Sequence, residues 1–230
     1  MKLTYKKGLS DGIPIALGYF SVSFAFGISS VKLSLSAAHA LLVSMTNLTS
    51  AGQLAGIGIM AGGGGILEMA LAMLIINLRY FLMSATVSQK LAPDVKWYDR
   101  FFMPFFMTDE IFALASSKES VGARYMYGLG TLPWLGWSAG TLAGALFGSV
   151  LPESVLCALD VAIYGMFIAV IIPASKKSRP VAIAAALSAA LSCVFSALGF
   201  TGGFSIIVCA LASSALLALI RPVKDEEGAK

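Results

Sequence analysis

The sequence has few charged side chains for its length. Only 12% of its 230 residues are Asp, Glu, Lys or Arg, about half the share found in an ordinary soluble domain. Hydrophobic residues make up 58% of the chain, which is more apolar surface than a soluble core can hide. We therefore expect lipid to solvate most of the chain.

Histidine and cysteine are scarce as well. The single histidine, His39, stands near the end of an apolar segment, and the three cysteines lie inside apolar segments without the spacing of metal ligands. An intramembrane hydrolase needs a nucleophile with a base, or a metal site. We therefore expect neither an enzyme nor a bound metal or other cofactor. The net charge of +4 fits a cytoplasmic lipid leaflet, and a nucleic-acid-binding motif is lacking.

Seven apolar segments follow one another along the chain. A membrane-spanning helix needs about 20 apolar residues, at about 1.5 Å each. The segments are Ile13–Val31, Ala37–Gly65, Met69–Val87, Tyr125–Leu151, Ser154–Ser175, Pro180–Gly199 and Gly203–Ile220. The pattern predicts an all-α, polytopic membrane helix bundle with about six to eight membrane segments. It forms one integral membrane transport domain over residues 1–221, followed by a short charged tail at 222–230.

The second segment, Ala37–Gly65, is too long for one simple helix, with 29 residues. It contains several polar residues and glycines, and it ends in four consecutive glycines. Backbone that leaves the helical conformation at membrane depth is tolerated only when it is buried in protein or lines a wet cavity. The composition therefore predicts that this segment is broken or re-entrant.

Basic residues distinguish two topologies, because they gather in cytoplasmic loops. If Ala37–Gly65 enters and leaves on one side, fourteen of the sixteen basic residues lie inside, with Lys32 outside and Arg79 buried. If Arg100–Lys118 instead forms an extra short crossing, eleven lie inside. The count favours the first topology, with both chain ends in the cytoplasm.

Arg79 is the eleventh of nineteen residues in Met69–Val87, close to the middle of the bilayer. Insertion scales put the cost of a central arginine at about 2.5–3.5 kcal/mol. About ten residues, or roughly 15 Å, separate Arg79 from either end of the segment, so snorkelling works poorly. We expect a carboxylate partner or a water-filled cavity, and the candidate carboxylates are Asp109, Glu110 and Asp160.

Asn77 precedes Arg79 by two positions and points about 200° away from it on a helix. The helix is therefore either polar on two sides or distorted near Asn77. Both alternatives place it inside the protein rather than against lipid.

Asp109 and Glu110 have two interpretations. Thr108 has the character of an N-cap, and acids in a first turn interact favourably with the helix dipole, by about 0.3–1 kcal/mol each. The same acids are flanked by phenylalanines and an isoleucine, where they could pair with Arg79 or titrate near neutral pH. The sequence leaves capping and a transport role equally open.

Glycines at four-residue spacing predict close helix packing, and they are Gly52, Gly56, Gly140, Gly144 and Gly148. Gln53 is different, because a buried amide needs partners. It could bind the amino or carboxyl group of a small solute, together with Asn47, Ser50 and Asn77.

Two segments share a weak likeness. "LGYFSVSFAFGISSVKLS" from Leu17 resembles "LGWSAGTLAGALFGSVLPES" from Leu135 in its Leu-Gly-aromatic start and a later Phe-Gly. Duplicated halves are common in transporters. The match is short and rich in small residues, so duplication and chance both explain it.

Several motifs in order resemble the AzlC-type, or azaleucine-resistance, family of branched-chain amino acid exporters. They are Gly12-Ile-Pro14 with Gly18 and "FAFG", "SAGQLA" at 50–55, "NLRYFLMS" at 77–84, "TDEIFAL" at 108–114, and Leu159-Asp160 followed by Phe167 and Pro173. The resemblance runs from about Gly12 to Arg221. The family more often has histidine after Arg79, where this chain has Tyr80.

The resemblance implies a large subunit that exports leucine, isoleucine, valine or methionine with a small AzlD-type membrane subunit. It also implies a bacterial cell membrane location. A proton or ion gradient is expected to drive transport, because the sequence contains no nucleotide-binding motif. The alternative is a membrane scaffold or channel subunit without substrate transport of its own, but such a protein would not need Arg79 and Asp160 inside apolar spans.

Overall fold

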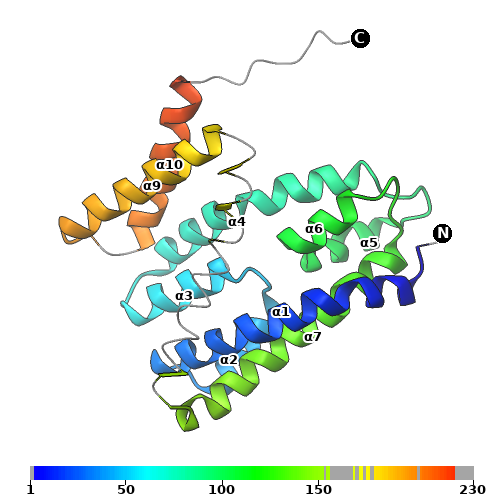
Figure 1. Cartoon of the computed structure of the whole chain (residues 1–230), viewed down its shortest axis with the longest axis horizontal. Helices are drawn as coiled ribbons and strands as arrows, with labels where there is room; N and C mark the ends of the chain where they lie inside the picture. The colour runs from blue at the N-terminus through cyan, green and yellow to red at the C-terminus, as the bar shows by residue number, and fades with distance from the viewer. Residues whose placement is uncertain are drawn as a thin grey trace.

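A computed structural model describes residues 3–152, 154–155, 168, 171–172, 175–176, 179–200 and 203–220. The described part is helical, with an isolated bridge between Leu91 and Val121. Its elements are α1 (Tyr5–Lys32), α2 (Ala37–Thr46), α3 (Ala51–Ala61), α4 (Ile66–Ser88), α5 (Trp97–Phe102), η1 (Met103–Phe106), α6 (Asp109–Ser116), α7 (Ala123–Phe147), η2 (Gly148–Val150), α9 (Arg179–Ala197) and α10 (Gly203–Ile220) (Figure 1). The predicted all-α membrane helix bundle is confirmed.

Three described helices are long and apolar enough to cross a membrane, namely α1, α4 and α9. Helix α4 carries an exposed stripe at three- and four-residue spacing, made of Leu67, Leu71, Leu74, Leu78 and Leu82. A continuous apolar stripe of this kind suits contact with lipid. Helix α4 therefore lies at the boundary of the described bundle and turns other faces inward.

Helices α1 and α7 form the most extensive helix contact of the described fold and run parallel to each other (Figure 1). A side chain on Gly140 would collide with the carbonyl of Phe20, and one on Gly144 would collide with that of Phe24. The residue numbers of the contacts rise together along both helices, which fixes the parallel direction. Because these glycines have no Cβ, the two helix backbones can approach each other closely.

Segment Ala37–Gly65 is broken, as predicted, into α2 and α3. Helix α2 starts at the C-terminal end of the α1–α7 pair and packs on α7. The hydroxyl of Ser44 in α2 lies 2.7 Å from the hydroxyl of Thr141 in α7. Helix α3 returns along α4, since Gly56 lies beside Met69 while Gly52, earlier in α3, lies beside Asn77. The segment thus turns back near the middle of the pair. We call α2 and α3 the first hairpin.

Segment Arg100–Lys118 does not cross the bundle either. Helix α4 ends beside the start of α7, where the Val121 amide donates to the Lys90 carbonyl at 2.8 Å. The end of α6 lies at this same N-terminal end of the α1–α7 pair, because the Lys90 ammonium donates to the Ser116 carbonyl at 2.5 Å. The start of α6 lies near the middle of α4, because Asp109, its first residue, pairs with Arg79 of α4. We call α5, η1 and α6 the second hairpin.

The two hairpins enter from opposite ends and meet near the middle (Figure 1). This arrangement corresponds to the topology in which Ala37–Gly65 is re-entrant, and the extra crossing at Arg100–Lys118 is absent from the described structure. A buried cluster holds the second hairpin against α7 and includes Met107, Ile111, Val121, Tyr125 and Leu129. A smaller cluster of Tyr19, Leu48 and Trp137 lies under the tip of the first hairpin.

Candidate functional site

A cavity of about 280 Å³ lies where the two hairpin tips meet. Helices α1, α4 and α7 and both hairpins contribute to its wall. The lining residues are Tyr19, Leu48, Ser50, Ala51, Ile76, Arg79, Tyr80, Thr108, Asp109, Glu110, Trp137 and Ile171. We call it the central cavity. Its wall combines three charged side chains with aromatic and aliphatic ones, as expected of a site for a small amphipathic molecule.

Arg79 forms an ion pair with Asp109 across the central cavity. Its Nη1 atom donates to the Asp109 Oδ2 atom at 2.7 Å, and its Nη2 atom donates to the Tyr80 hydroxyl at 3.2 Å. The two charged side chains keep 38% and 32% of their surface exposed, so both remain accessible from the cavity. Of the three candidate carboxylates, Asp109 is the one that pairs with Arg79 in the described structure, and the pair lines a cavity.

Asp109 and Glu110 also occupy the first turn of α6. The Thr108 hydroxyl caps this helix by accepting from the Ile111 amide at 3.5 Å. Capping and cavity lining, which the sequence presented as alternatives, therefore occur together. Consecutive residues of a helix point about 100° apart, so Asp109 faces α4 while Glu110 faces α1.

Glu110 accepts a hydrogen bond from the Tyr19 hydroxyl at 2.5 Å. The same two residues also line a second cavity of about 320 Å³, beside the α1 residues Pro14, Ile15, Gly18 and Val22. The Tyr19–Glu110 pair therefore stands between the central cavity and this second one. We call the second one the α1 cavity.

Gln53 does not line the central cavity and is only 3% exposed. Its Nε2 atom donates to the carbonyls of Val43 and Asn47, at 3.2 and 2.6 Å. Its Oε1 atom accepts from the Trp137 indole nitrogen at 2.9 Å. The Gln53 amide therefore links α2, α3 and α7 by hydrogen bonds and stabilises the tip of the first hairpin.

The remaining predicted polar residues take different positions. Ser50 lines the central cavity directly before α3. The Asn47 side chain accepts from the Thr49 amide at 2.9 Å and shapes the turn between α2 and α3. Asn77 lies beside Gly52 of α3 and does not line the cavity. Because Asn77 and Arg79 point about 200° apart on an unbroken helix, α4 is polar on two faces. Asp160 lies outside the described residues.

The predicted packing glycines lie at helix contacts. Gly140, Gly144 and Gly148 face α1, and Gly52 is closely surrounded by Thr49 and Asn77. A Cβ added to Gly56 would lie 3.5 Å from the Met69 sulfur. The first three leave no room for a side chain. The Gly56 contact is an ordinary van der Waals distance.

Sequence reasoning missed the aromatic residues of the site. Tyr19 and Trp137 both line the central cavity, and their rings meet edge to face with centroids 5.4 Å apart. They are the aromatic residues of the two Leu-Gly-aromatic triplets that begin at Leu17 and Leu135. The like segments lie side by side, because Gly136 packs on the carbonyl of Ala16. The repeated Leu-Gly-aromatic triplet is the sequence feature that could have identified Tyr19 and Trp137 as site residues.

Residues 136–140 read Gly-Trp-Ser-Ala-Gly and match the Gly-x-Ser-x-Gly pattern of hydrolases. In those enzymes the serine sits on a sharp turn between a strand and a helix. Here Ser138 lies inside α7, and its hydroxyl oxygen is buried without a hydrogen-bond partner in the described structure. His39 instead contacts Ser36 at 2.8 Å. The pattern therefore packs a helix and does not form a nucleophile.

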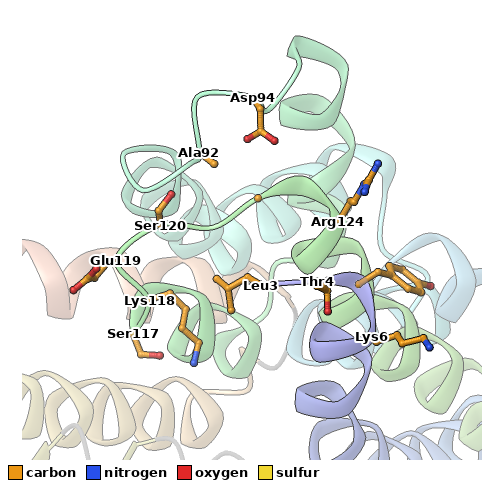
Figure 2. A pocket seen from close by; sticks show the side chains of 12 residues that line it. Leu3, Thr4, Lys6, Ala92, Asp94, Ser117, Lys118, Glu119, Ser120 and Arg124 are labelled. Atoms are coloured by element: carbon orange, nitrogen blue, oxygen red, sulfur yellow. The ribbon is translucent and has the colours of Figure 1, made fainter. Parts of the chain in front are cut away.

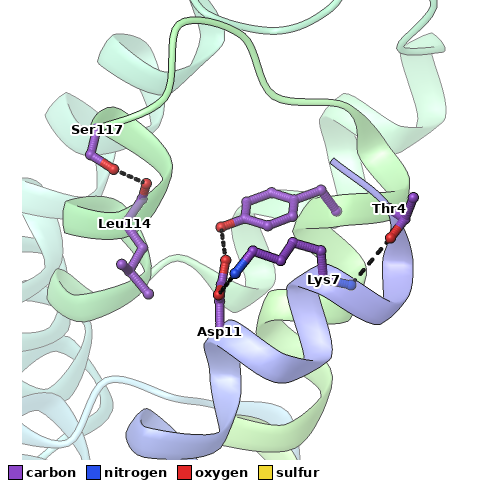
Figure 3. Close-up of polar contacts among 6 residues, drawn as sticks. Thr4, Lys7, Asp11, Leu114 and Ser117 are labelled. Atoms are coloured by element: carbon purple, nitrogen blue, oxygen red, sulfur yellow. Dashed lines mark hydrogen bonds and ion pairs between the residues drawn. The ribbon is translucent and has the colours of Figure 1, made fainter. Parts of the chain in front are cut away.

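A wide hollow of about 1060 Å³ opens at the N-terminal end of the α1–α7 pair. Figure 2 shows that side chains of both charge signs surround it, the basic Lys6, Lys118 and Arg124 and the acidic Asp94 and Glu119. Nearby, Lys7 pairs with Asp11 at 2.6 Å within α1 (Figure 3). The described residues contain no group of three or more His, Cys, Asp or Glu side chains placed to hold a metal.

The described fold and site define a helical membrane protein with charged groups inside its bundle. The chain belongs to the AzlC family, whose model, described as "AzlC protein", matches residues 14–151. AzlC proteins form a membrane transporter family related to branched-chain amino acid transport.

Two relatives support this assignment. The chain is 26% identical to "Inner membrane protein YgaZ" of Escherichia coli (strain K12), over 82% of this chain and 80% of that protein. It is 31% identical to an "Uncharacterized membrane protein" of Archaeoglobus fulgidus, over 92% of this chain and 93% of that one. No solved structure matches the chain significantly.

Proposed function

We propose that the chain exports hydrophobic amino acids such as leucine, isoleucine, valine and methionine. The observation that carries this proposal is the composition of the central cavity, where Arg79, Asp109 and Glu110 face aromatic and aliphatic side chains. A zwitterion with an apolar side chain presents both kinds of surface. The volume of about 280 Å³ is at the lower end for ligand pockets and suits a small solute.

The substrate binds with its charged groups toward α4 and α6. Arg79 meets the carboxylate with the planar donor fork that suits such a group. Asp109 or Glu110 meets the ammonium group. Leu48, Ile76 and the rings of Tyr19 and Trp137 surround the apolar side chain, where each buried methylene contributes about 0.8 kcal/mol.

Transport requires the central cavity to open alternately toward the two membrane faces. The two hairpins enter from opposite ends and meet at this cavity, and broken helices that meet a substrate at mid-membrane are typical of secondary transporters. Movement of one hairpin tip against the α1–α7 pair would open one side. A proton or ion gradient drives the cycle.

The N-terminal end of the α1–α7 pair faces the cytoplasm of a bacterial cell. Support comes from the basic residues gathered at that end, which are Lys6, Lys7, Lys90, Lys96, Arg100, Lys118 and Arg124. Lys32 lies at the other end. This distribution follows the positive-inside rule. A small AzlD-type membrane subunit completes the exporter, and a neighbouring gene for a protein of about 100 residues with several spans would support it.

The proposal is tested with Arg79→Gln, which keeps a shorter polar side chain but removes the charge that Asp109 and the substrate require. We expect leucine export from loaded cells to fall at least about tenfold, the effect of losing about 1.4 kcal/mol. Export and the amount of protein in the membrane are measured together. The matched control is Arg100→Gln on the exposed side of α5, which we expect to export normally.

Normal export by Arg79→Gln at a normal membrane level would contradict the proposal. The alternative, a scaffold or channel subunit, predicts that deletion of the chain leaves resistance to toxic leucine analogues unchanged. Loss of resistance on deletion favours the exporter.

A further inference from the structure

Glu110 differs from the other charged residues of the central cavity in having no cationic partner among the residues that the structure describes. Arg79 and Asp109 are already paired at 2.7 Å. Glu110 accepts from the neutral Tyr19 hydroxyl, and among the described lining residues Arg79 is the sole cation. One half-buried carboxylate in the cavity therefore lacks a positive partner among the described residues, and partial burial makes an unpaired charge costly.

In the part of the chain that the structure describes, the other ionisable groups near Glu110 come from three helices. They are Tyr19 of α1, Arg79 and Tyr80 of α4, and Asp109 of α6 itself. Helix α7 and the first hairpin contribute Trp137, Leu48 and Ser50, which do not titrate near neutral pH. A single positive charge can therefore be accepted at Glu110 without breaking the Arg79–Asp109 pair.

We propose that a proton and the ammonium group of the substrate compete for Glu110, and that this competition couples export to proton entry. The proposal rests on the proposed export function and adds the coupling ion and its site. A protonated Glu110 is a neutral acid with no charge to offer an ammonium group. An ionised Glu110 pairs with the ammonium group while Arg79 meets the carboxylate.

The exchange balances in charge and protons. When the amino acid binds, Glu110 releases its proton and the carboxylate forms an ion pair with the ammonium group, which keeps its own three protons. When the amino acid leaves, a proton returns to the carboxylate. One proton therefore moves for each amino acid, in the opposite direction.

Tyr19 positions Glu110 for this exchange. Its hydroxyl donates to one oxygen of the carboxylate, and the other oxygen, which has no hydrogen-bond partner among the described residues, can take a proton or an ammonium group. Because Tyr19 and Glu110 line both the central cavity and the α1 cavity, the carboxylate can be reached from two sides. The proton and the substrate therefore need not use the same path.

The test measures protons released when leucine binds. The full-length chain is purified in detergent, with any small subunit that copurifies, and titrated with leucine by calorimetry in two buffers of different ionisation enthalpy. For the wild type we expect release of up to one proton per leucine at low pH. Leucine affinity should fall about tenfold per pH unit once Glu110 is protonated, as thermodynamic linkage requires.

Two variants assign the proton. Glu110→Gln should bind leucine more weakly, release no proton and show no pH dependence of affinity. The control Glu119→Gln, in the exposed loop before α7, should behave as the wild type. Tyr19→Phe keeps the carboxyl group but removes its hydrogen-bond donor, so proton release on leucine binding should persist.

The outcomes separate the two proposals. Wild-type protein that binds leucine with unchanged affinity from about pH 5 to 8, without proton release, overturns the coupling at Glu110 and leaves the export function standing. Proton release that persists in Glu110→Gln overturns it as well. Wild-type protein that binds none of leucine, isoleucine, valine and methionine overturns the proposed function itself.

Discussion

At the scale of single residues, one charge organises the site. Arg79 is near mid-membrane in a largely apolar helix, and it is paired with Asp109 from the second hairpin. A buried ion pair contributes little net stability compared with apolar packing, but breaking it leaves an uncompensated charge. The Arg79–Asp109 pair therefore holds the hairpin tip in place while remaining open to the central cavity.

The pair predicts a double-mutant result. Arg79→Gln and Asp109→Asn should each destabilise the protein, by up to about 3 kcal/mol, because each leaves one charge unpaired. The double variant should recover most of this loss, because neither charge remains. Thermal unfolding midpoints of the purified proteins in detergent provide the measurement. Strictly additive losses would mean that the two charges do not stabilise each other.

At the scale of elements, the parallel contact between α1 and α7 depends on particular glycines. Gly18 and Gly136 occupy equivalent places in the two like segments. A Cβ on Gly136 would lie 2.6 Å from the Ala16 carbonyl, whereas one on Gly18 meets nothing within 4 Å. Equivalent sequence positions therefore have different packing roles.

This difference predicts opposite effects of one substitution. Gly136→Ala should destabilise the protein by about 1–3 kcal/mol, because it forces the helices apart. Gly18→Ala should leave stability unchanged or raise it by up to about 1 kcal/mol, because alanine favours the helix. Both variants are compared by thermal unfolding in the same detergent. Equal destabilisation by the two would contradict the α1–α7 contact.

Sequence patterns predicted the elements better than their pairing. Long apolar runs indicated α1, α4 and α7, and the polar, glycine-rich composition of Ala37–Gly65 indicated its break. The parallel contact of α1 with α7 was not predictable, because small residues permit contact without naming the partner helix. Tyr19 and Trp137 escaped notice because aromatic residues in an apolar helix normally face lipid or core.

Some residues of the central site were predictable from sequence, and others were not. Charges inside apolar spans are costly, so Arg79, Asp109 and Glu110 stood out. Gln53 stood out equally, yet it bonds to Val43, Asn47 and Trp137 and does not line the cavity. A buried amide requires partners, and the sequence does not tell whether protein or substrate supplies them.

At the scale of the whole molecule, the helices and the two hairpins end at three different levels along the α1–α7 pair. The ends of both hairpins and of the spanning helices lie at two levels, and the hairpin tips define a third level at the central cavity. Backbone at that level is covered by α1, α4 and α7, as membranes require of non-helical segments. The fold thereby brings Ser50 and Asp109 to one cavity.

This architecture predicts the sides of two loops. With the N-terminal end in the cytoplasm, Lys96 should be cytoplasmic and Gly64 external, because α4 alone crosses between them. Truncated fusions of green fluorescent protein and of alkaline phosphatase at each position test this, since the first is fluorescent only inside and the second active only outside. We expect fluorescence at Lys96 and phosphatase activity at Gly64. If Ala37–Gly65 crossed the membrane, the two results would be exchanged. That outcome would contradict the arrangement in which the two hairpins enter from opposite ends and meet at the central cavity.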